Sequence, residues 1–425
     1  MKQYLSVFFV FVVASAWSMQ MLAVDYKFSF NKQDTKKGFV AISEKTFYGA
    51  NSAYGYDLNT VQNGKDPFFF SVDLPEGNYR VKLTLGNQEF ETNTTVRSES
   101  RRLMLENIKI PKGKFVTREI SVNLRNTKIG TRDSVKIKPR EMGKLNWDNK
   151  LTLEINGIHP SLTRLEISSA DNIPTVFLAG NSTVVDQDDE PWCGWGQILP
   201  RFMSPKIAIA NYAESGEAGN TFIRSNRFAK LLHEMKKGDY LFIEFGHNDM
   251  KQKGENAGAF KSYKQSLVYM IDETRKKGGT PVLVTPMNRR RFDDNGKVIN
   301  TLEDFPDAVR LTGKELNVMV VDLNAMSKVL YEAWGPNESV KAFVHYPAGT
   351  FPGQKTDLAD NTHFNTFGGY EICKCILKGL KDNKSPLSKY IVKDFTTFDP
   401  AKPDKFSDFS IPATPFSSTE KPDGN

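Results

Sequence analysis

The sequence predicts an α/β protein with a doubly wound parallel sheet, preceded by an all-β sandwich. Up to about residue 168, apolar and polar residues alternate with the period of two that marks strands with one buried face. After residue 172, short apolar runs alternate with helical patterns, which is typical of parallel strands covered by helices on both faces. The length of 425 residues suits two or three domains.

The chain begins with a segment that has the layout of a secretory signal peptide. Residues 1–23 carry a positive charge at Lys2, an apolar stretch over 5–14, and small residues at 14–16 and at Ala23, which give two candidate cleavage points, after Ala16 or after Ala23. The apolar stretch is shorter than the roughly 20 residues of a membrane span. We therefore expect cleavage and export to the periplasm or the medium, with no stable membrane span left afterwards, rather than a retained anchor.

The β-sandwich module is expected over 24–170. A strand at 68–74, a turn at 75–77 and an alternating strand at 79–85 predict a hairpin with one buried face. Further alternation occurs at 120–124 and 151–155. Several short strands at this spacing suggest a sandwich.

The α/β domain is expected over 171–392. Four residues that recur at helical spacing, Tyr263, Leu267, Met270 and Ile271, mark one helix face. The predicted strands of the sheet are 175–179, 207–210, 240–245, 281–285 and 318–323. Ligands of such sheets bind beyond the carboxyl ends of the strands.

The last segment, 393–425, carries five prolines and many Ser, Thr and Asp residues from about Phe395 onward. This composition predicts a tail that is extended over the surface or disordered.

Polar residues follow the first three predicted strands. The first ends in Gly-Asn-Ser, which puts the hydroxyl of Ser182 at the sheet edge, although Ser at this place more often caps a helix. Gly216 follows the second strand and can bring a backbone N–H close to a ligand, or simply form a turn. The third ends in Gly-His-Asn-Asp, where the amide of Asn248 can point at a developing oxyanion.

A further pair lies near the end of the α/β domain. Asp360 precedes His363 by three residues, just before an amphipathic helix that starts near Thr366. A carboxylate at this distance can hold one ring nitrogen while the other faces a serine. The alternative is a helix-capping Asp beside an incidental His.

In this order, the four blocks resemble the SGNH (GDSL-like) hydrolase superfamily over about 175–385. The resemblance implies a flavodoxin-like fold, with Ser182 as nucleophile, His363 as base and Asp360 as its partner. It also implies an oxyanion hole made by the N–H groups of Ser182 and Gly216 and the amide of Asn248. Neither a metal nor a cofactor is expected.

A narrower resemblance is to the rhamnogalacturonan acetylesterase branch. It rests on Gly-Asn-Ser-Thr-Val at 180–184, Gly-Trp-Gly-Gln at 194–197, Thr-Pro at 285–286 with Arg-Arg-Arg-Phe at 289–292, and 360–364. The implied function is a secreted serine esterase that removes O-acetyl groups from pectic rhamnogalacturonan. Two departures are Asn181, where the family often has Asp, and the segment 214–220, which differs from the Gly-Arg-Ser run often seen there.

Substrate contacts are expected from side chains near these blocks. The net charge of +7 suits an acidic polysaccharide, and one arginine of the run can pair with a uronate carboxylate. Trp192 can stack on a sugar ring or pack in the core. The export signal and the lack of a basic stripe with interleaved aromatics argue against nucleic acid. The candidate contacts are His247, Arg289, Arg290, Arg291 and Trp192.

Three alternatives stay open. The same triad would serve an acetylxylan or other glycan O-acetylesterase, or a glycan-binding protein could carry an inactive hydrolase domain. The β-sandwich resembles galactose-binding-like, jelly-roll modules, which would bind glycan or, as we slightly favour, buttress the catalytic domain. The three cysteines, Cys193, Cys373 and Cys375, are too few for a disulfide framework and suggest no zinc site. Buried free thiols are expected, and the alternative is one bridge from Cys193 to either of the other two.

Overall fold

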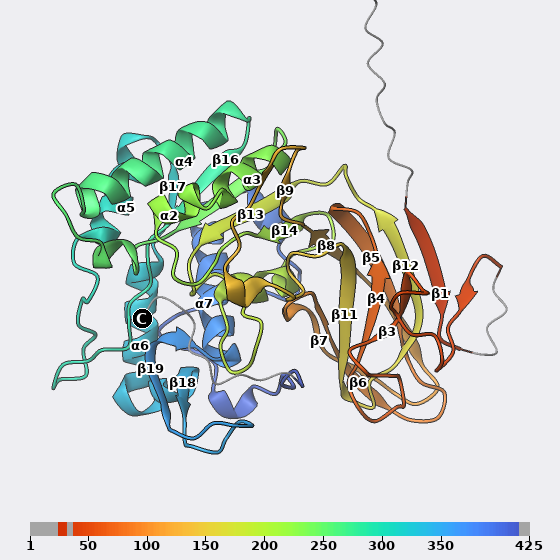
Figure 1. Cartoon of the computed structure of the whole chain (residues 1–425). Coiled ribbons are helices and arrows are strands. Elements are labelled where there is room, and N and C mark those ends of the chain that lie inside the picture. Colours follow the sequence, from red (N-terminus) through yellow and green to blue (C-terminus); the bar gives the residue numbers. More distant parts are fainter. Residues whose placement is uncertain (1–23, 32–36, 416–425) are drawn as a thin grey trace, which may run out of the picture.

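The computed structural model describes residues 24–31 and 37–415. The expected signal peptide, 1–23, lies outside the described residues, as does 416–425. None of the described helices has the length and apolar character needed to cross a bilayer. Figure 1 shows an all-β region, called the β region below, beside a parallel sheet surrounded by helices, called the α/β region.

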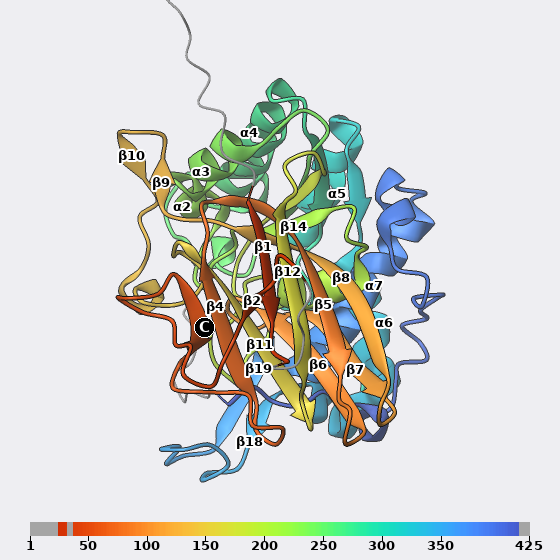
Figure 2. The ribbon, with the colours of Figure 1, turned by 90° about the vertical axis from the view of Figure 1, so that its right-hand side faces the viewer.

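The β region consists mainly of two five-stranded sheets. The strands of the first sheet are β1 (Asp25–Ser29), β2 (Val40–Ala41), β5 (Gly77–Gly86), β8 (Phe115–Leu124) and β12 (Leu162–Ser169). Those of the second are β3 (Tyr54–Asp57), β4 (Phe68–Asp73), β6 (Thr92–Ser98), β7 (Arg102–Ile110) and β11 (Lys150–Ile158). Their orders are β2-β1-β12-β5-β8 and β3-β4-β11-β6-β7. A short ribbon of β9 (Lys128–Ile129) and β10 (Asp133–Ser134) extends toward the α/β region (Figure 2).

Side chains of both sheets meet in one apolar core. Leu83 and Ile167 come from the first sheet, Phe70 and Leu153 from the second, and all four are fully buried. The alternation along β5 has a direct cause, because every second side chain enters this core while Lys82 faces solvent.

The expected hairpin between 68–74 and 79–85 is wrong. Both segments are strands, but β4 pairs with β3 and β11, whereas β5 pairs with β12 and β8 in the other sheet. The turn at 75–77 therefore carries the chain from one sheet to the other. Alternation reports that one face of a strand is buried, and this holds equally for a hairpin and for two strands on opposite sides of a core.

The α/β region contains the predicted doubly wound parallel sheet. Its strands are β14 (Ala208–Asn211), β13 (Thr175–Gly180), β15 (Tyr240–Glu244), β16 (Thr280–Val284) and β17 (Met319–Val321), in this spatial order and all parallel. Each of the five apolar runs became a strand, with ends shifted by at most two residues. These strands are covered on both faces, so their sequences are apolar without interruption.

Helices cover both faces of this sheet. One face packs against α2 (Gly219–Arg224), α3 (Arg227–Glu234), α4 (Lys264–Lys276) and α5 (Phe305–Glu315). The other packs against α1 (Trp195–Ile198), α6 (Leu323–Glu338) and α7 (Thr366–Asp382). The expected helix face lies on α4 and in the turn before it, and all four of its residues are buried. The expected helix near residue 366 is α7.

The strand order places one switch point beside β13. The chain leaves β13 for β14 on one side, and then crosses back to β15 on the other. Crevices in doubly wound sheets open at such a point, beyond the carboxyl ends of the strands. A two-stranded ribbon, β18 (Phe343–Tyr346) and β19 (Leu358–Phe364), supplies further residues to the site described below.

The described part of the tail, 393–415, returns along the boundary between the two regions. The hydroxyl of Thr414 donates to Glu154 at 2.8 Å, and the carbonyl of Pro412 accepts a hydrogen bond from Arg97. Arg97 and Glu154 both belong to the β region, so this segment connects the C-terminal part of the described chain to the β region.

The three cysteines are buried and free, as expected. Burial raises the pKa of the Cys193 thiol to about 12.

Candidate active site

The side chains of Ser182, His363 and Asp360 form a hydrogen-bonded chain. The Oγ atom of Ser182 lies 2.7 Å from Nε2 of His363, and Nδ1 of His363 lies 2.7 Å from Oδ2 of Asp360. Ser182 follows the end of β13, whereas the other two residues lie on β19. Ser182 and His363 are 3% and 2% exposed, so the proton-transfer path is shielded from bulk water.

The environment of Asp360 keeps its carboxylate charged. Burial alone would raise its pKa, but the hydrogen bond and charge of His363 outweigh burial. The backbone N–H groups of Thr362 and His363 also donate to Oδ1, at 2.8 and 3.0 Å. The net result is a pKa of Asp360 far below the usual range, so this carboxylate can orient and stabilise an imidazolium at neutral pH.

Three hydrogen-bond donors are placed near the serine by neighbouring strand ends. The backbone N–H groups of Ser182 and Gly216 bond to no residue among those the structure describes. Gly216 has a φ of +80°, which favours glycine. The side-chain amide of Asn248 donates to the carbonyl of Glu217 at 3.1 Å, so this amide is fixed between the second and third strand ends.

Asp249 supports the turn that carries Asn248. Its two carboxylate oxygens each accept a backbone N–H at 2.9 Å, from Gly246 and from Gly219. Burial raises the pKa of Asp249 to about 6, against the effect of these two bonds. The carboxyl group is therefore used in joining two loops.

His247 is buried beside the triad and is surrounded by cations. Burial lowers its pKa well below the usual value, and the charges of Arg289, His363 and Lys251 lower it further. Its side chain is 2% exposed and both ring nitrogens are buried, so the structure places His247 out of reach of a substrate hydroxyl group, as it does Trp192 for a sugar ring.

Arg289 and Arg290 are half-buried and bond only to uncharged acceptors within the described chain. Arg289 donates to the carbonyl of Thr301 at 3.1 Å and to that of His247 at 3.4 Å. Burial lowers the pKa of both guanidinium groups, and no carboxylate offsets this effect. A guanidinium group without an acidic partner is suited to an anionic ligand.

Arg290 also holds the strand that carries Asp360. Its backbone N–H donates to the carbonyl of Asn361, and its Nη1 donates to the Asn361 side chain, both at 2.8 Å. His345 reaches the same side-chain oxygen at 3.0 Å. Arg290 thus acts on the triad strand, and Arg291 beside it is exposed to solvent.

The structure does not support Trp192 as a stacking platform. Its side chain is 2% exposed, so neither ring face is open to a sugar. The sequence allowed both stacking and burial for Trp192, and the structure favours burial. Trp195 lies in the core, where its indole N–H donates to the buried carboxyl group of Glu244. Burial raises the pKa of Glu244 to about 7.

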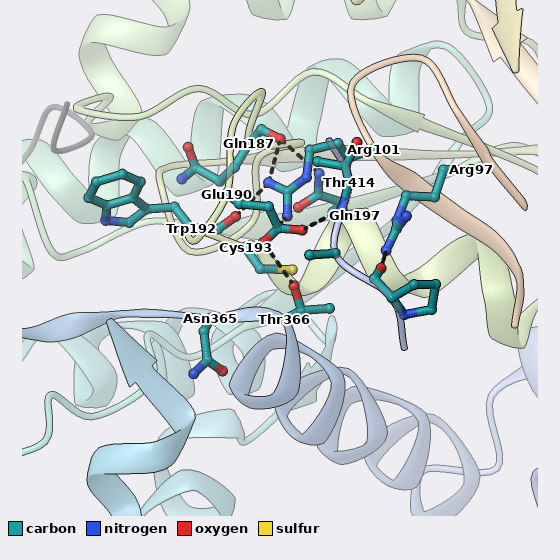
Figure 3. A network of polar contacts seen from close by, with 12 residues as sticks. Arg97, Arg101, Gln187, Glu190, Trp192, Cys193, Gln197, Asn365, Thr366 and Thr414 are labelled. Carbon is teal, nitrogen blue, oxygen red and sulfur yellow. Dashed lines mark hydrogen bonds and ion pairs between the residues drawn. The ribbon is translucent and has the colours of Figure 1, made fainter. Parts of the chain in front are cut away.

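Figure 3 shows a buried polar network where the β region meets the loop after Ser182. Arg101, in the turn between β6 and β7, forms an ion pair of 2.7 Å with Glu190. It also donates to the carbonyl of Trp192 at 2.8 Å. Glu190 in turn accepts from the backbone N–H of Thr414 at 3.3 Å. Side chains of the β region therefore fix a loop of the α/β region.

Gln187 connects this network to the candidate nucleophile, and the sequence did not single it out. Its backbone carbonyl accepts from Arg101 at 3.3 Å and from Gln197 at 2.9 Å. Its side-chain amide donates to the carbonyl of Ser182 at 2.9 Å and to Oγ of Ser215 at 3.4 Å. No spacing in the sequence marks Gln187, because its partners come from three separate segments.

Among the residues described, no cluster of three His, Cys, Asp or Glu side chains has an arrangement that could hold a metal ion.

Comparisons with known proteins show what this chain is similar to. Residues 178–368 match the model of the GDSL-like Lipase/Acylhydrolase family. The chain is 40% identical to Rhamnogalacturonan acetylesterase RhgT of Bacillus subtilis (strain 168) over 219 residues, 51% of this chain and 94% of that protein. It is 33% identical to Probable rhamnogalacturonan acetylesterase YesY of the same organism, over 52% of this chain and 98% of that one. The crystal structure of Bacillus subtilis YxiM aligns with 85% of this chain and 99% of that chain, at 21% identity and a TM-score of 0.47.

Proposed function

Because this chain belongs to the GDSL-like lipase/acylhydrolase family and is a carbohydrate esterase, we propose that it removes O-acetyl groups from pectic rhamnogalacturonan. The observation that carries the activity is the hydrogen-bonded chain from Asp360 through His363 to Ser182. The names of RhgT and YesY support the choice of polysaccharide.

The geometry supports a two-step acyl transfer. Oγ of Ser182 attacks the acetyl carbonyl carbon while Nε2 of His363 takes the hydroxyl proton. The tetrahedral intermediate breaks its bond to the sugar oxygen, which receives that proton from His363. Water, deprotonated by the same imidazole, then attacks the acetyl-serine. The bond from the acetyl carbon to Oγ of Ser182 breaks, Oγ receives the proton from His363, and acetate leaves. Asp360 holds Nδ1 of the imidazole and stabilises its charged form in both steps.

The oxyanion of each intermediate is proposed to be bound by the N–H groups of Ser182 and Gly216 and by the amide of Asn248. The two backbone donors are uncommitted within the described chain, and the Asn248 amide is held beside them. Losing one side-chain donor of this kind typically costs about 3–4 kcal/mol of transition-state stabilisation.

We further propose that Arg289 recognises a galacturonate carboxylate, with Arg291 at the exposed rim. Arg289 is half-buried, donates to the carbonyl of His247 and has no carboxylate partner among the described residues. Acetylated xylan offers little negative charge, so this contact would distinguish the two polymers.

The β region is proposed to be a galactose-binding-like sandwich that buttresses the catalytic residues. Its support is the buried network of Arg101 with Glu190 and Trp192 (Figure 3). Export is proposed from the layout of residues 1–23. N-terminal sequencing of the protein recovered from the cell exterior tests this, and a protein that retains Lys2 in the cytoplasm would refute it.

The decisive experiment measures acetate release from acetylated rhamnogalacturonan, acetylated xylan and 4-nitrophenyl acetate. We expect the highest kcat/KM on rhamnogalacturonan. Equal rates on both polymers would refute the substrate assignment while leaving the esterase intact.

Variants test the triad in the same assays. Ser182→Ala and His363→Ala should each lower kcat by at least about 10⁴-fold, because these two residues act as one unit. His233→Ala, on α3 and half-exposed, is the matched control and should keep full activity. Full activity in either triad variant would exclude the proposed mechanism. A wild type that releases no acetate from any of the three substrates would instead favour a glycan-binding role.

A further inference from the structure

The carbonyl group between Ser215 and Gly216 accepts hydrogen bonds from two cationic side chains of the β region. Nζ of Lys138 lies 2.5 Å from the carbonyl oxygen of Ser215, and Nη2 of Arg140 lies 3.4 Å from the same atom. Both cations flank Pro139 in the connection between β10 and β11, more than 70 residues before their acceptor.

These hydrogen bonds to the Ser215 carbonyl determine the direction of the N–H of Gly216. In a trans peptide, the C=O and N–H bonds lie in one plane and point in opposite directions. A cation that holds the carbonyl of Ser215 therefore fixes the plane and directs the N–H away from Lys138. That N–H is one of the two uncommitted backbone donors at the site. The positive charge of the ammonium group beside the carbonyl oxygen also polarises the amide and strengthens its N–H as a donor.

Lys138 is itself held in place by a buried cluster. Its backbone N–H donates to Glu141 at 2.7 Å. Glu141 forms an ion pair with the fully buried Arg227 of α3 and accepts the indole N–H of Trp147 at 2.9 Å. The ammonium group thus approaches Ser215 from a fixed base.

The same ammonium group also reaches the residue that holds the third donor. Nζ of Lys138 lies 3.5 Å from the side chain of Glu217, whose backbone carbonyl accepts the amide of Asn248. One side chain of the β region is therefore linked to two of the three oxyanion donors.

We propose that Lys138 is a positioning residue for the oxyanion hole, acting through the Ser215–Gly216 peptide, and that the β region thereby completes the active site. The inference rests on the proposed esterase mechanism. Acylation and deacylation both pass through an oxyanion, so weakening one donor slows both steps alike. We expect Lys138→Met to lower kcat about 10- to 100-fold with KM unchanged, which is less than the 10²–10³-fold typical of a deleted donor.

The test uses 4-nitrophenyl acetate, so it does not depend on which polysaccharide is the substrate. Lys138→Arg, which keeps a cation within reach of the carbonyl, should restore most of kcat. Lys136→Met is the matched control: this lysine lies two residues away and donates to the carbonyl of Arg224, away from the site, at 3.4 Å. It should stay within twofold of the wild type.

A second readout follows the oxyanion hole itself. An aryl boronic acid forms a tetrahedral adduct with a catalytic serine, so its inhibition constant should rise by the factor by which kcat falls. If Lys138→Met is recovered unfolded, Lys138→Gln replaces it under the same criteria. A change in kcat below twofold, an unchanged inhibition constant or an equal loss in Lys136→Met would overturn the inference.

Failure of the proposed function looks different. If the wild type did not hydrolyse aryl acetate, or if Ser182→Ala kept its activity, the mechanism itself would be wrong. If the wild type is active and Ser182→Ala is inactive while Lys138→Met equals the wild type, only the positioning role is refuted.

Discussion

Replacing Arg101 with methionine should loosen the loop that follows the nucleophile. The substitution removes an ion pair of 2.7 Å with Glu190 and the hydrogen bond to the carbonyl of Trp192. Both charged side chains are more than nine-tenths buried. Breaking a buried pair from one side costs about 3–5 kcal/mol, because the remaining charge has no partner. Glu190 keeps weak bonds from Thr366 and Thr414, at 3.4 and 3.3 Å, so we expect about 3 kcal/mol.

Hydrogen exchange detected by mass spectrometry measures this loss where it occurs. About 3 kcal/mol corresponds to an exchange rate roughly a hundredfold higher for amides in 183–197, at about 1.4 kcal/mol per factor of ten. The kcat for aryl acetate should fall as well, because Gln187 lies in this loop and bonds to Ser182.

The control for Arg101→Met is Arg80→Met. Arg80 pairs with Glu119 at 3.1 Å on the same β region, and both side chains are 40% exposed. An exposed pair contributes less than about 1 kcal/mol, so exchange in 183–197 should not change. The double variant Arg101→Met with Glu190→Gln should recover part of the loss, because no charge stays unpaired. Unchanged protection of 183–197 in Arg101→Met would refute the buttress argument.

Three further outcomes are expected. Asp360→Asn should lower kcat by about 10⁴-fold, as in other triads. Folding lowers the pKa of Asp360, so the stability that its carboxylate contributes is present above about pH 4 and is lost as the pH falls below that value. Asp360→Asn lacks this titration. Its stability should therefore depend less on pH below about pH 4 than that of the wild type. Arg289→Gln should raise KM for acetylated rhamnogalacturonan about tenfold and leave the hydrolysis of aryl acetate unchanged. The control, Arg275→Gln at an exposed position, should change neither. The same rise in KM in both variants would refute the carboxylate contact. Because burial raises the pKa of Cys193 to about 12, the native protein should resist a thiol reagent until denaturant exposes three thiols, and rapid labelling before unfolding would contradict the buried state.

The parallel sheet and the triad were predictable from the sequence for a physical reason. Strands covered on both faces are apolar without interruption, so each of the five runs stands out. The triad residues follow β13 or lie on β19 next to α7, where abrupt changes from apolar to polar residues mark them. Tight local spacing, as between Asp360 and His363, also survives into the folded chain as a direct hydrogen bond.

The supporting contacts were not predictable in the same way. Lys138 and Ser215 are 77 residues apart, and Arg101 and Trp192 are 91 apart. Side-chain partners at such separations depend on how two regions dock, and no periodicity in the sequence encodes docking. The burial of Trp192 was not predictable for the same reason, because the loop that covers an indole near a site decides whether it is exposed.

The returning tail has a consequence for the order in which the protein is assembled. Arg97 and Glu154 form a buried ion pair on neighbouring strands β6 and β11, and both complete their hydrogen bonds with Pro412 and Thr414. The ribosome adds Thr414 260 residues after Glu154. The β region is therefore synthesised first, but its buried ion pair obtains all of its hydrogen-bond partners only after the tail has been synthesised and has docked. Removing Pro412 and the residues after it should leave Arg97 and Glu154, in the β region, without these two hydrogen-bond partners.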